Sequence, residues 1–388
     1  MSTANDLTLD NKRLERARRY DRIHNWLFLV DLLLILVALS AMMYRGERGV
    51  SFALLRLIEH HLSTHRWIAT AAYLGAVVTG YVVAFLPYHW FKGYYLEHQF
   101  QLSTQRWYQW LADELKSWLV MLAVVVPLGS LWYWFMRAAG AWWWLWAAAG
   151  WIFFQVILGM VFPVLILPLF YRSRPVEDTS LLAAVEDLAR RCGVRVLGVY
   201  RLGLSAKTRK ANAALAGLGA TKRVLLGDTL LDHFTPQEVL CVLAHEFGHY
   251  WHAHLPKLLV VTGASAVVGM WLADRVMRAL AALLGISDLT CVATFPLLLL
   301  ALLVFAVLTL PCMNALARHC ERRADLFALE TTRDPDAFIS AMTRLAASNL
   351  SNPEPHPLIE WLLHSHPSIA RRIAAARAWQ AARGSGAI

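Results

Sequence analysis

The sequence predicts a mostly α-helical, polytopic membrane protein with about six membrane-spanning helices and a polar portion that contains a small β-sheet. Hydrophobic residues make up 58% of the 388 residues and charged residues only 16%, against roughly 45–50% and about 25% in average soluble domains. The hydrophobic residues are concentrated in six nearly uncharged runs, which suit a hydrocarbon core roughly 30 Å thick. A polar stretch between the fourth and fifth runs carries short strand-like segments. Disordered, collagen-like and disulfide-stapled classes are excluded.

The six runs define the predicted spans. They are 26–44, 67–88, 118–136, 141–171, 258–276 and 292–313. The fourth contains Pro163 and Pro168, so we expect it to be tilted, kinked or re-entrant. The first follows an Arg-rich segment and lacks a signal-peptide pattern, which predicts a retained anchor. Asp31 lies inside the first span, and we expect its carboxylate near the interface or facing the other helices.

The distribution of basic residues predicts the orientation in the membrane. With the N-terminus inside, the outer segments hold 7 of the 37 Lys and Arg residues: Arg45, Arg48, Arg56, Arg66, Arg137, Arg275 and Arg278. This bias follows the positive-inside rule, so the N-terminus and both polar segments are expected in the cytoplasm. The net charge of +10 therefore reflects topology. It does not indicate nucleic-acid binding, because no base-reading or stacking elements accompany it.

The two polar segments are expected to form one domain. In the first, a helix and three strands are predicted at 180–191, 194–202, 211–218 and 223–226. The second, 314–388, is helical, with a break at 352–355 and a restart at Pro367. We therefore divide the chain into an N-terminal membrane region, 1–171, with four spans, and a domain, 172–388, that includes the spans 258–276 and 292–313.

A metal-binding motif lies in the first polar segment. His245-Glu246-Phe247-Gly248-His249 is an HExxH sequence, whose two His side chains share one face of a helix and can bind one metal ion. Glu246 is placed to polarise a metal-bound water. The sequence predicts the required helix clearly, because Thr235-Pro236-Gln237-Glu238 is a capping box with proline at the first helical position. Pro256 is expected to mark the end of this helix.

A hydrolytic zinc site needs a third protein ligand and an open position. The candidate is Glu321, and Asp325 one turn later is expected to accept a hydrogen bond from a ligand His. The alternative to a metal site is that Glu321 and Asp325 belong to a charged surface patch that follows a membrane helix. The competing third ligands are His252, His254 and His319. The five Cys residues form no CxxC pair, and Cys241 is expected to be a packing residue.

Two further elements suggest substrate handling. Asn212 and Ala213 begin a predicted edge strand, with which an extended peptide could pair. His366 and Arg372 open the last helix, where they could donate hydrogen bonds to the oxyanion that develops on an attacked carbonyl.

With these motifs the sequence resembles the integral-membrane zinc metalloproteases of the CAAX prenyl protease 1 family, which are gluzincins with HExxH and a distant ExxxD. The matching residues extend through most of the chain. They are Glu97, Phe100, Thr104, Asp113, Lys116, Pro168–Phe170, Pro175–Asp178, Asn212-Ala213, Gly227–Leu231, His245–His249, Glu321–Asp325 and His366-Pro367. The eukaryotic members have seven spans, and this sequence lacks one after the first helix.

The resemblance implies a barrel of membrane helices around a large water-filled chamber, with 172–388 as the zinc metallopeptidase domain. One Zn²⁺ per chain would be held by His245, His249 and Glu321, with Glu246 as general base. Asn212, His366 and Arg372 would contact the substrate or the transition state. The implied activity is that of a zinc metalloendopeptidase.

The expected protein is a bacterial homologue in the inner membrane, with its active site facing the cytoplasm. Its substrates would be prenylated C-termini or misfolded membrane proteins. The sequence alone leaves two alternatives open. One is a non-catalytic membrane scaffold or transporter with a structural metal. The other is an intramembrane protease, which the polar sequence before the motif disfavours.

Overall fold

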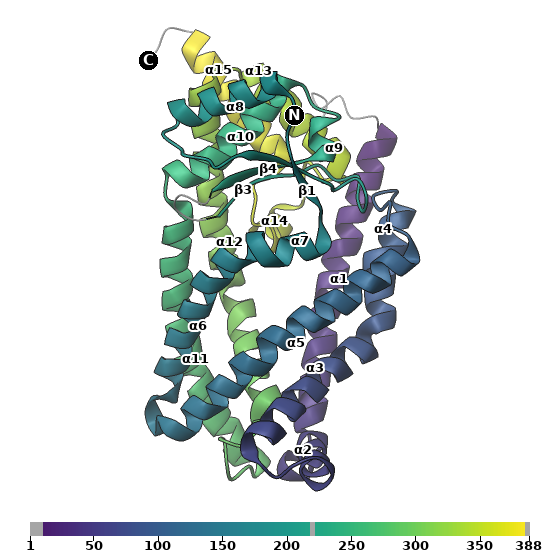
Figure 1. The fold of residues 1–388 in the computed structure, drawn as a ribbon, viewed down its shortest axis with the longest axis vertical. Coiled ribbons are helices and arrows are strands. Elements are labelled where there is room, and N and C mark those ends of the chain that lie inside the picture. Colours follow the sequence, from purple (N-terminus) through teal and green to yellow (C-terminus); the bar gives the residue numbers. More distant parts are fainter. Residues whose placement is uncertain (1–10, 218–221, 385–388) are drawn as a thin grey trace.

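The computed structural model describes residues 11–217 and 222–384. Long helices form a bundle at one end, and a head of short helices around a small sheet lies at the other (Figure 1). Both ends of the described chain lie on the side of the head. The predicted fold class is confirmed.

Six helical stretches are long and apolar enough to cross a membrane within the described residues, as predicted. They are Asn11–Met43, Arg66–Gln99, Trp107–Ala138, Gly140–Phe170, His254–Leu284 and Val292–Thr332. The corresponding regular helices are α1 (Asn11–Met43), α3 (Arg66–Trp90), α5 (Trp107–Ala138), α6 (Trp143–Val161), α11 (His254–Leu284) and α12 (Phe295–Thr332). The helices extend beyond the predicted apolar runs, and α12 carries polar residues of the head on its last turns.

Short helical turns interrupt or join these long helices. They are η2 (Gly46–Arg48), η3 (Phe91–Tyr95), α4 (Leu96–Gln99), η4 (Gly140–Trp142), η5 (Phe162–Ile166), α7 (Leu167–Phe170) and η7 (Val292–Thr294). The π-helical η5 contains Pro163, which accounts for the irregularity predicted in the fourth span. The π-helical η3 carries Lys92, which pairs with Asp31 of α1. Asp31 thus faces another helix, as expected.

A 12-residue helix, α2 (Val50–His61), follows the first span at the far end of the bundle (Figure 1). At about 1.5 Å per residue it is too short to cross a membrane. The Ser51 hydroxyl fixes it there, because it lies 2.5 Å from the Tyr73 hydroxyl of α3 and donates to the Ala293 carbonyl at 2.5 Å.

The head contains a four-stranded sheet in the order β1-β2-β4-β3. Its strands are β1 (Ser173–Pro175), β2 (Val199–Leu202), β3 (Ala213–Ala216) and β4 (Arg223–Gly227). β2 and β4 are parallel, and both outer pairs are antiparallel. Strand β1 was not predicted. The predicted strand 194–202 is shorter in the structure because Val194 N donates to Ala189 O and so completes the preceding helix end.

β3 is an edge strand, as predicted, but it begins at Ala213, after Asn212. The backbone before it has other partners, since the Asn349 side chain pairs with both the N–H and the carbonyl of Ala211. The end of the predicted strand, Leu218, lies outside the described residues.

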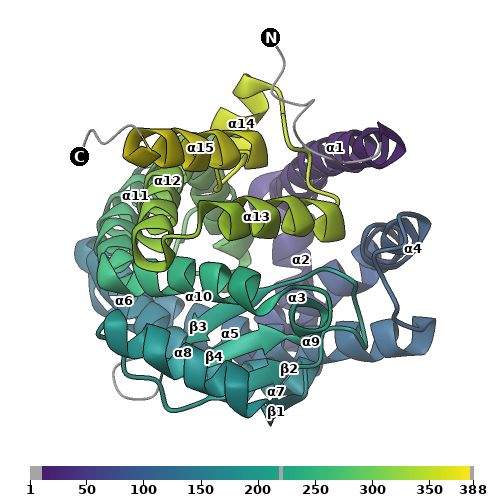
Figure 2. The same ribbon diagram turned by 90° about the horizontal axis from the view of Figure 1, so that it is seen from above.

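The remaining helices pack around the sheet. They are α8 (Thr179–Arg191), α9 (Asp228–Leu231), α10 (Pro236–Trp251), α13 (Pro335–Asn349), α14 (Pro357–Leu363) and α15 (Ile369–Gly384). Seen from above, α10 lies between the sheet and α13, and α15 lies beyond α13 (Figure 2). Fully buried side chains from four elements meet there, among them Leu188, Leu226, Phe247 and Phe338. The break at 352–355 is confirmed, whereas α14 was not predicted.

Helices α10 and α12 pack closely, and this contact determines where the chemistry lies. A Cβ atom at Gly248 would lie only 3.0 Å from Ala324 Cα, so glycine allows the two backbones to approach. The polar end of the last membrane helix is thereby held against the helix that carries the HExxH motif.

Candidate metal centre and peptidase site

The HExxH motif lies on α10, and its cap is the predicted one. Thr235 Oγ1 accepts from Glu238 N at 3.3 Å, and Glu238 Oε2 accepts from Thr235 N at 2.7 Å. The predicted end was wrong, because the helix stops at Trp251 and Pro256 lies in the first turn of α11. Proline is tolerated there because the first-turn N–H groups have no partner within the helix.

Three predicted ligands converge. His245 and His249 on α10 meet Glu321 on α12, and one ligand atom from each lies within 4.8 Å of the others. His245 Nε2 is 3.3 Å from Glu321 Oε2, and His249 Nε2 is 3.3 Å from Glu321 Oε1. The two Nε2 atoms are 3.1 Å apart. The alternative ligands His252, His254 and His319 are not part of this group.

The chemistry of this group fits a zinc ion. Two imidazole nitrogens and one carboxylate are a common catalytic zinc donor set. Glu321 Oε2 is buried and accepts no hydrogen bond of good geometry, although ring nitrogens of His245 and His366 lie 3.3 and 2.9 Å away. A buried carboxylate oxygen in this position is costly unless a cation satisfies it.

Behind His245 lies a buried ion pair. Asp325 Oδ1 accepts from His245 Nδ1 at 2.8 Å, and Arg372 donates to both Asp325 oxygens at 2.5 and 2.8 Å. Burial disfavours the protonated ring, but hydrogen bonds to Asp325 and Glu321 outweigh it and raise the pKa of His245 to about 9. A metal ion at this site therefore competes with a proton.

Glu246 faces a pocket of about 620 Å³ that also contacts His245, Glu321 and Arg372. Burial, opposed by the neighbouring His245 and His249, raises the pKa of the Glu246 carboxyl above its ordinary value. A raised pKa brings a carboxylate closer to the working range of a proton acceptor near neutral pH.

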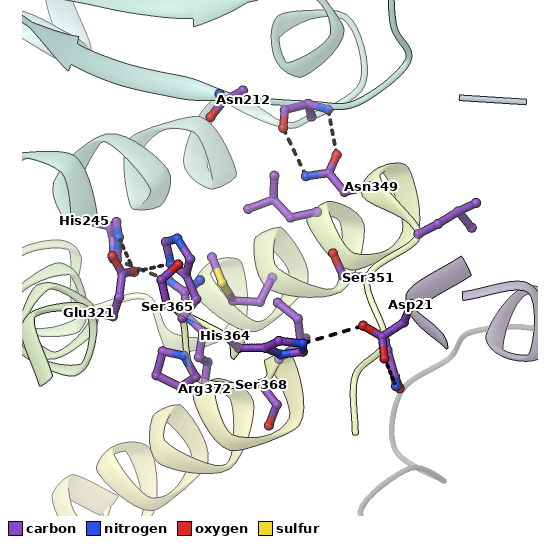
Figure 3. A pocket seen from close by; sticks show the side chains of 18 of the residues that line it. Asp21, Asn212, His245, Glu321, Asn349, Ser351, His364, Ser365, Ser368 and Arg372 are labelled. Atoms are coloured by element: carbon purple, nitrogen blue, oxygen red, sulfur yellow. Dashed lines mark hydrogen bonds and ion pairs between the residues drawn. The ribbon is translucent and has the colours of Figure 1, made fainter. Parts of the chain in front are cut away.

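The predicted substrate residues also line this pocket. Figure 3 shows Asn212 and Arg372 around it, and Ala213 follows Asn212 on the edge strand. His366 Nδ1 lies 2.9 Å from Glu321 Oε2. Arg372 points to Asp325 rather than standing free for an oxyanion.

Sequence reasoning missed the far wall of the pocket. Asp21 of α1 lines it together with Asn349 and His364 (Figure 3), and His24 of the same helix also contacts the pocket. Asn352 donates to Asp21 at 2.9 Å, and His364 Nε2 lies 3.7 Å from the same carboxylate. These are isolated polar residues in distant segments, so no spacing pattern could have revealed them. Cys241 is buried and its thiol lies 3.7 Å from Thr332 Oγ1, as expected for a packing residue.

With this geometry described, comparisons with known proteins identify the family. A family model described as "Peptidase family M48" matches residues 175–380. The chain belongs to peptidase family M48. A second family model, "CAAX prenyl protease N-terminal, five membrane helices", matches residues 4–172. In the described part of that match, this M48 protein has four candidate spans and the short α2.

Relatives of this M48 protein occur in bacteria and eukaryotes. It is 29% identical over 365 residues to the uncharacterized metalloprotease YhfN of Bacillus subtilis, covering 92% of this chain and 84% of the relative. It is 26% identical over 324 residues to CAAX prenyl protease 1 of Saccharomyces cerevisiae, covering 78% and 71%. The crystal structure of S. mikatae Ste24p has the same fold, with a TM-score of 0.83, 21% identity and coverage of 95% and 90%. The protein is a membrane-embedded metalloprotease.

Proposed function

We propose that the protein is a zinc metalloendopeptidase that holds one Zn²⁺ with His245, His249 and Glu321. The convergence of these three side chains carries the proposal, together with the buried Glu321 Oε2 atom, which accepts no hydrogen bond of good geometry. When bound, zinc supplies a Lewis acid that polarises the scissile carbonyl and lowers the pKa of a water molecule.

The chain's own residues supply the proton transfer and the positioning. Glu246 would take a proton from the attacking water and pass it to the leaving amine. Asp325, held by Arg372, keeps the Nδ1–H of His245 engaged, so that Nε2 remains free as an acceptor. His366 stands beside the ligand carboxylate, where its ring could donate to an oxyanion. An extended peptide would pair with the free edge of β3 near Asn212 and Ala213.

We also propose the predicted division at 171/172, with the bacterial inner membrane as location and the N-terminus and active site on the cytoplasmic side. The excess of basic residues on that side supports this orientation. The names of the relatives support prenylated C-termini with a CAAX motif as substrates. Misfolded membrane proteins are the second substrate class that we propose.

Two experiments test the proposal. Replacement of Glu321 by Ala should release the metal, measured as zinc content of the purified protein, and an unchanged content would refute its role as ligand. Wild type and Glu246→Gln are then compared on farnesylated and unmodified peptides of the same sequence. Cleavage of both peptides by wild type indicates a broad membrane peptidase, and cleavage of the farnesylated one alone a prenyl-protein protease. Turnover by Glu246→Gln would refute the general base.

A further inference from the structure

A third histidine lies against the second ligand histidine. His254, the first residue of α11, is 2% exposed. Its Nδ1 atom is 3.0 Å from His249 Nδ1, and the two ring centroids are 5.0 Å apart at 73°. Its second ring nitrogen, Nε2, is buried without a hydrogen-bond partner.

The backbone bends between α10 and α11, and this bend places the His254 ring against His249. On a continuous helix, position i+5 lies about 140° around the axis from position i, so His254 would point away from His249. Instead α10 ends at Trp251 and Ala253 adopts the left-handed conformation with φ 51° and ψ 43°. Non-glycine residues rarely adopt this conformation, and such strain persists where the surroundings hold it. The contact between the two rings therefore depends on a specific backbone conformation that the fold maintains.

The two facing Nδ1 atoms can form one N–H···N hydrogen bond. The chemistry of a metal ligand determines which of the two rings donates it. His249 can offer Nε2 to a metal only as the neutral ring protonated on Nδ1. His249 Nδ1–H must then donate, and His254 Nδ1 must accept. His254 in turn carries its own proton on Nε2, the atom that is buried without a partner.

We propose that His254 is a positioning residue that fixes the tautomer and ring orientation of His249 as a metal ligand. This inference rests on the proposed role of His249. The two ligand histidines then differ in the group that accepts their Nδ1–H hydrogen bond. His245 donates to the carboxylate of Asp325, which raises ligand basicity, whereas His249 donates to a neutral imidazole that adds no charge beside Glu321 and Glu246.

The test measures the zinc dissociation constant by competition with a chromophoric chelator on the full-length protein in detergent. Outer partners of ligand histidines are worth about 10–100-fold in metal affinity, so His254→Leu should weaken zinc binding by that factor. His254→Asn places an amide oxygen near the position of Nδ1 and should restore most of the affinity. His60→Leu, the same change at an exposed position on α2 at the far end of the bundle, should leave the affinity unchanged.

Two outcomes overturn the inference. Wild-type affinity in His254→Leu would show that the contact does not position the ligand. Equal loss in the Leu and Asn variants would show that the ring acts by packing rather than by accepting a hydrogen bond. Failure of the proposed ligand set itself would appear separately, as undiminished zinc binding in His249→Ala.

Discussion

Breaking the buried ion pair of Asp325 and Arg372 should cause a loss of folding stability and a loss of zinc affinity, and the two can be measured separately. In Asp325→Ala, the His245 Nδ1–H and the Arg372 guanidinium lose acceptors at 2.8 and 2.5 Å. The Asp325 and Arg372 side chains are 8% and 10% exposed, and an unpaired buried charge costs about 3–5 kcal/mol of folding free energy. Loss of the acceptor behind His245 should also weaken zinc binding about 10–100-fold, or roughly 1.4–2.8 kcal/mol.

Denaturant unfolding with excess chelator measures the loss of folding stability alone, because no zinc is bound. Competition with a chelator measures the loss of zinc affinity. The double variant Asp325→Ala/Arg372→Met removes both charges, so it should regain most of the stability but none of the zinc affinity. Asp187→Ala is the matched control, because its pairs with Arg190 and Arg191 are solvent-exposed and should be worth less than about 1 kcal/mol. A stability loss in Asp325→Ala no larger than in Asp187→Ala would refute the argument from burial. Recovery of zinc affinity in the double variant would refute the orientation of His245 by Asp325.

Three further predictions concern the helices that carry the ligands. Gly248→Ala should weaken zinc binding, because its Cβ would lie 3.0 Å from Ala324 Cα and separate α10 from α12, whereas Gly159→Ala, with open space around its Cβ, should not. Thr235→Ala should lower the free energy of unfolding by about 1 kcal/mol through loss of the N-cap, and Thr235→Ser should preserve it; equal values for the Ala and Ser variants would contradict the cap. Chelation should lower the thermal unfolding midpoint of wild type, because a ligand at 100 times its Kd stabilises the folded state by about 2.7 kcal/mol. An unchanged midpoint in Glu321→Ala on chelation is the control for that effect.

The sequence was most informative where local chemistry determines structure. The cap at Thr235 and Pro236 predicted the start of α10, and the one-turn spacing of His245 and His249 predicted their shared face. The helical spacing of Glu321 and Asp325 likewise placed both on the inner face of α12, where they meet α10.

Tertiary contacts determine what the sequence did not reveal. Asp21 and His24 lie near the start of the first membrane helix, and only the fold brings them to a pocket built by residues more than 180 positions away. The reversal at Ala253, which turns His254 towards His249, carries no glycine or asparagine to mark it. The three-residue strand β1 forms only because β2 offers it a free edge.

The central claim is that one metal ion and Glu246 together hydrolyse peptide bonds. Its most direct test measures zinc content and peptide turnover of Glu246→Gln beside wild type in the same preparation. We expect one zinc per chain in both proteins and loss of turnover in the variant alone. Turnover near the wild-type rate in a zinc-loaded Glu246→Gln protein would contradict it.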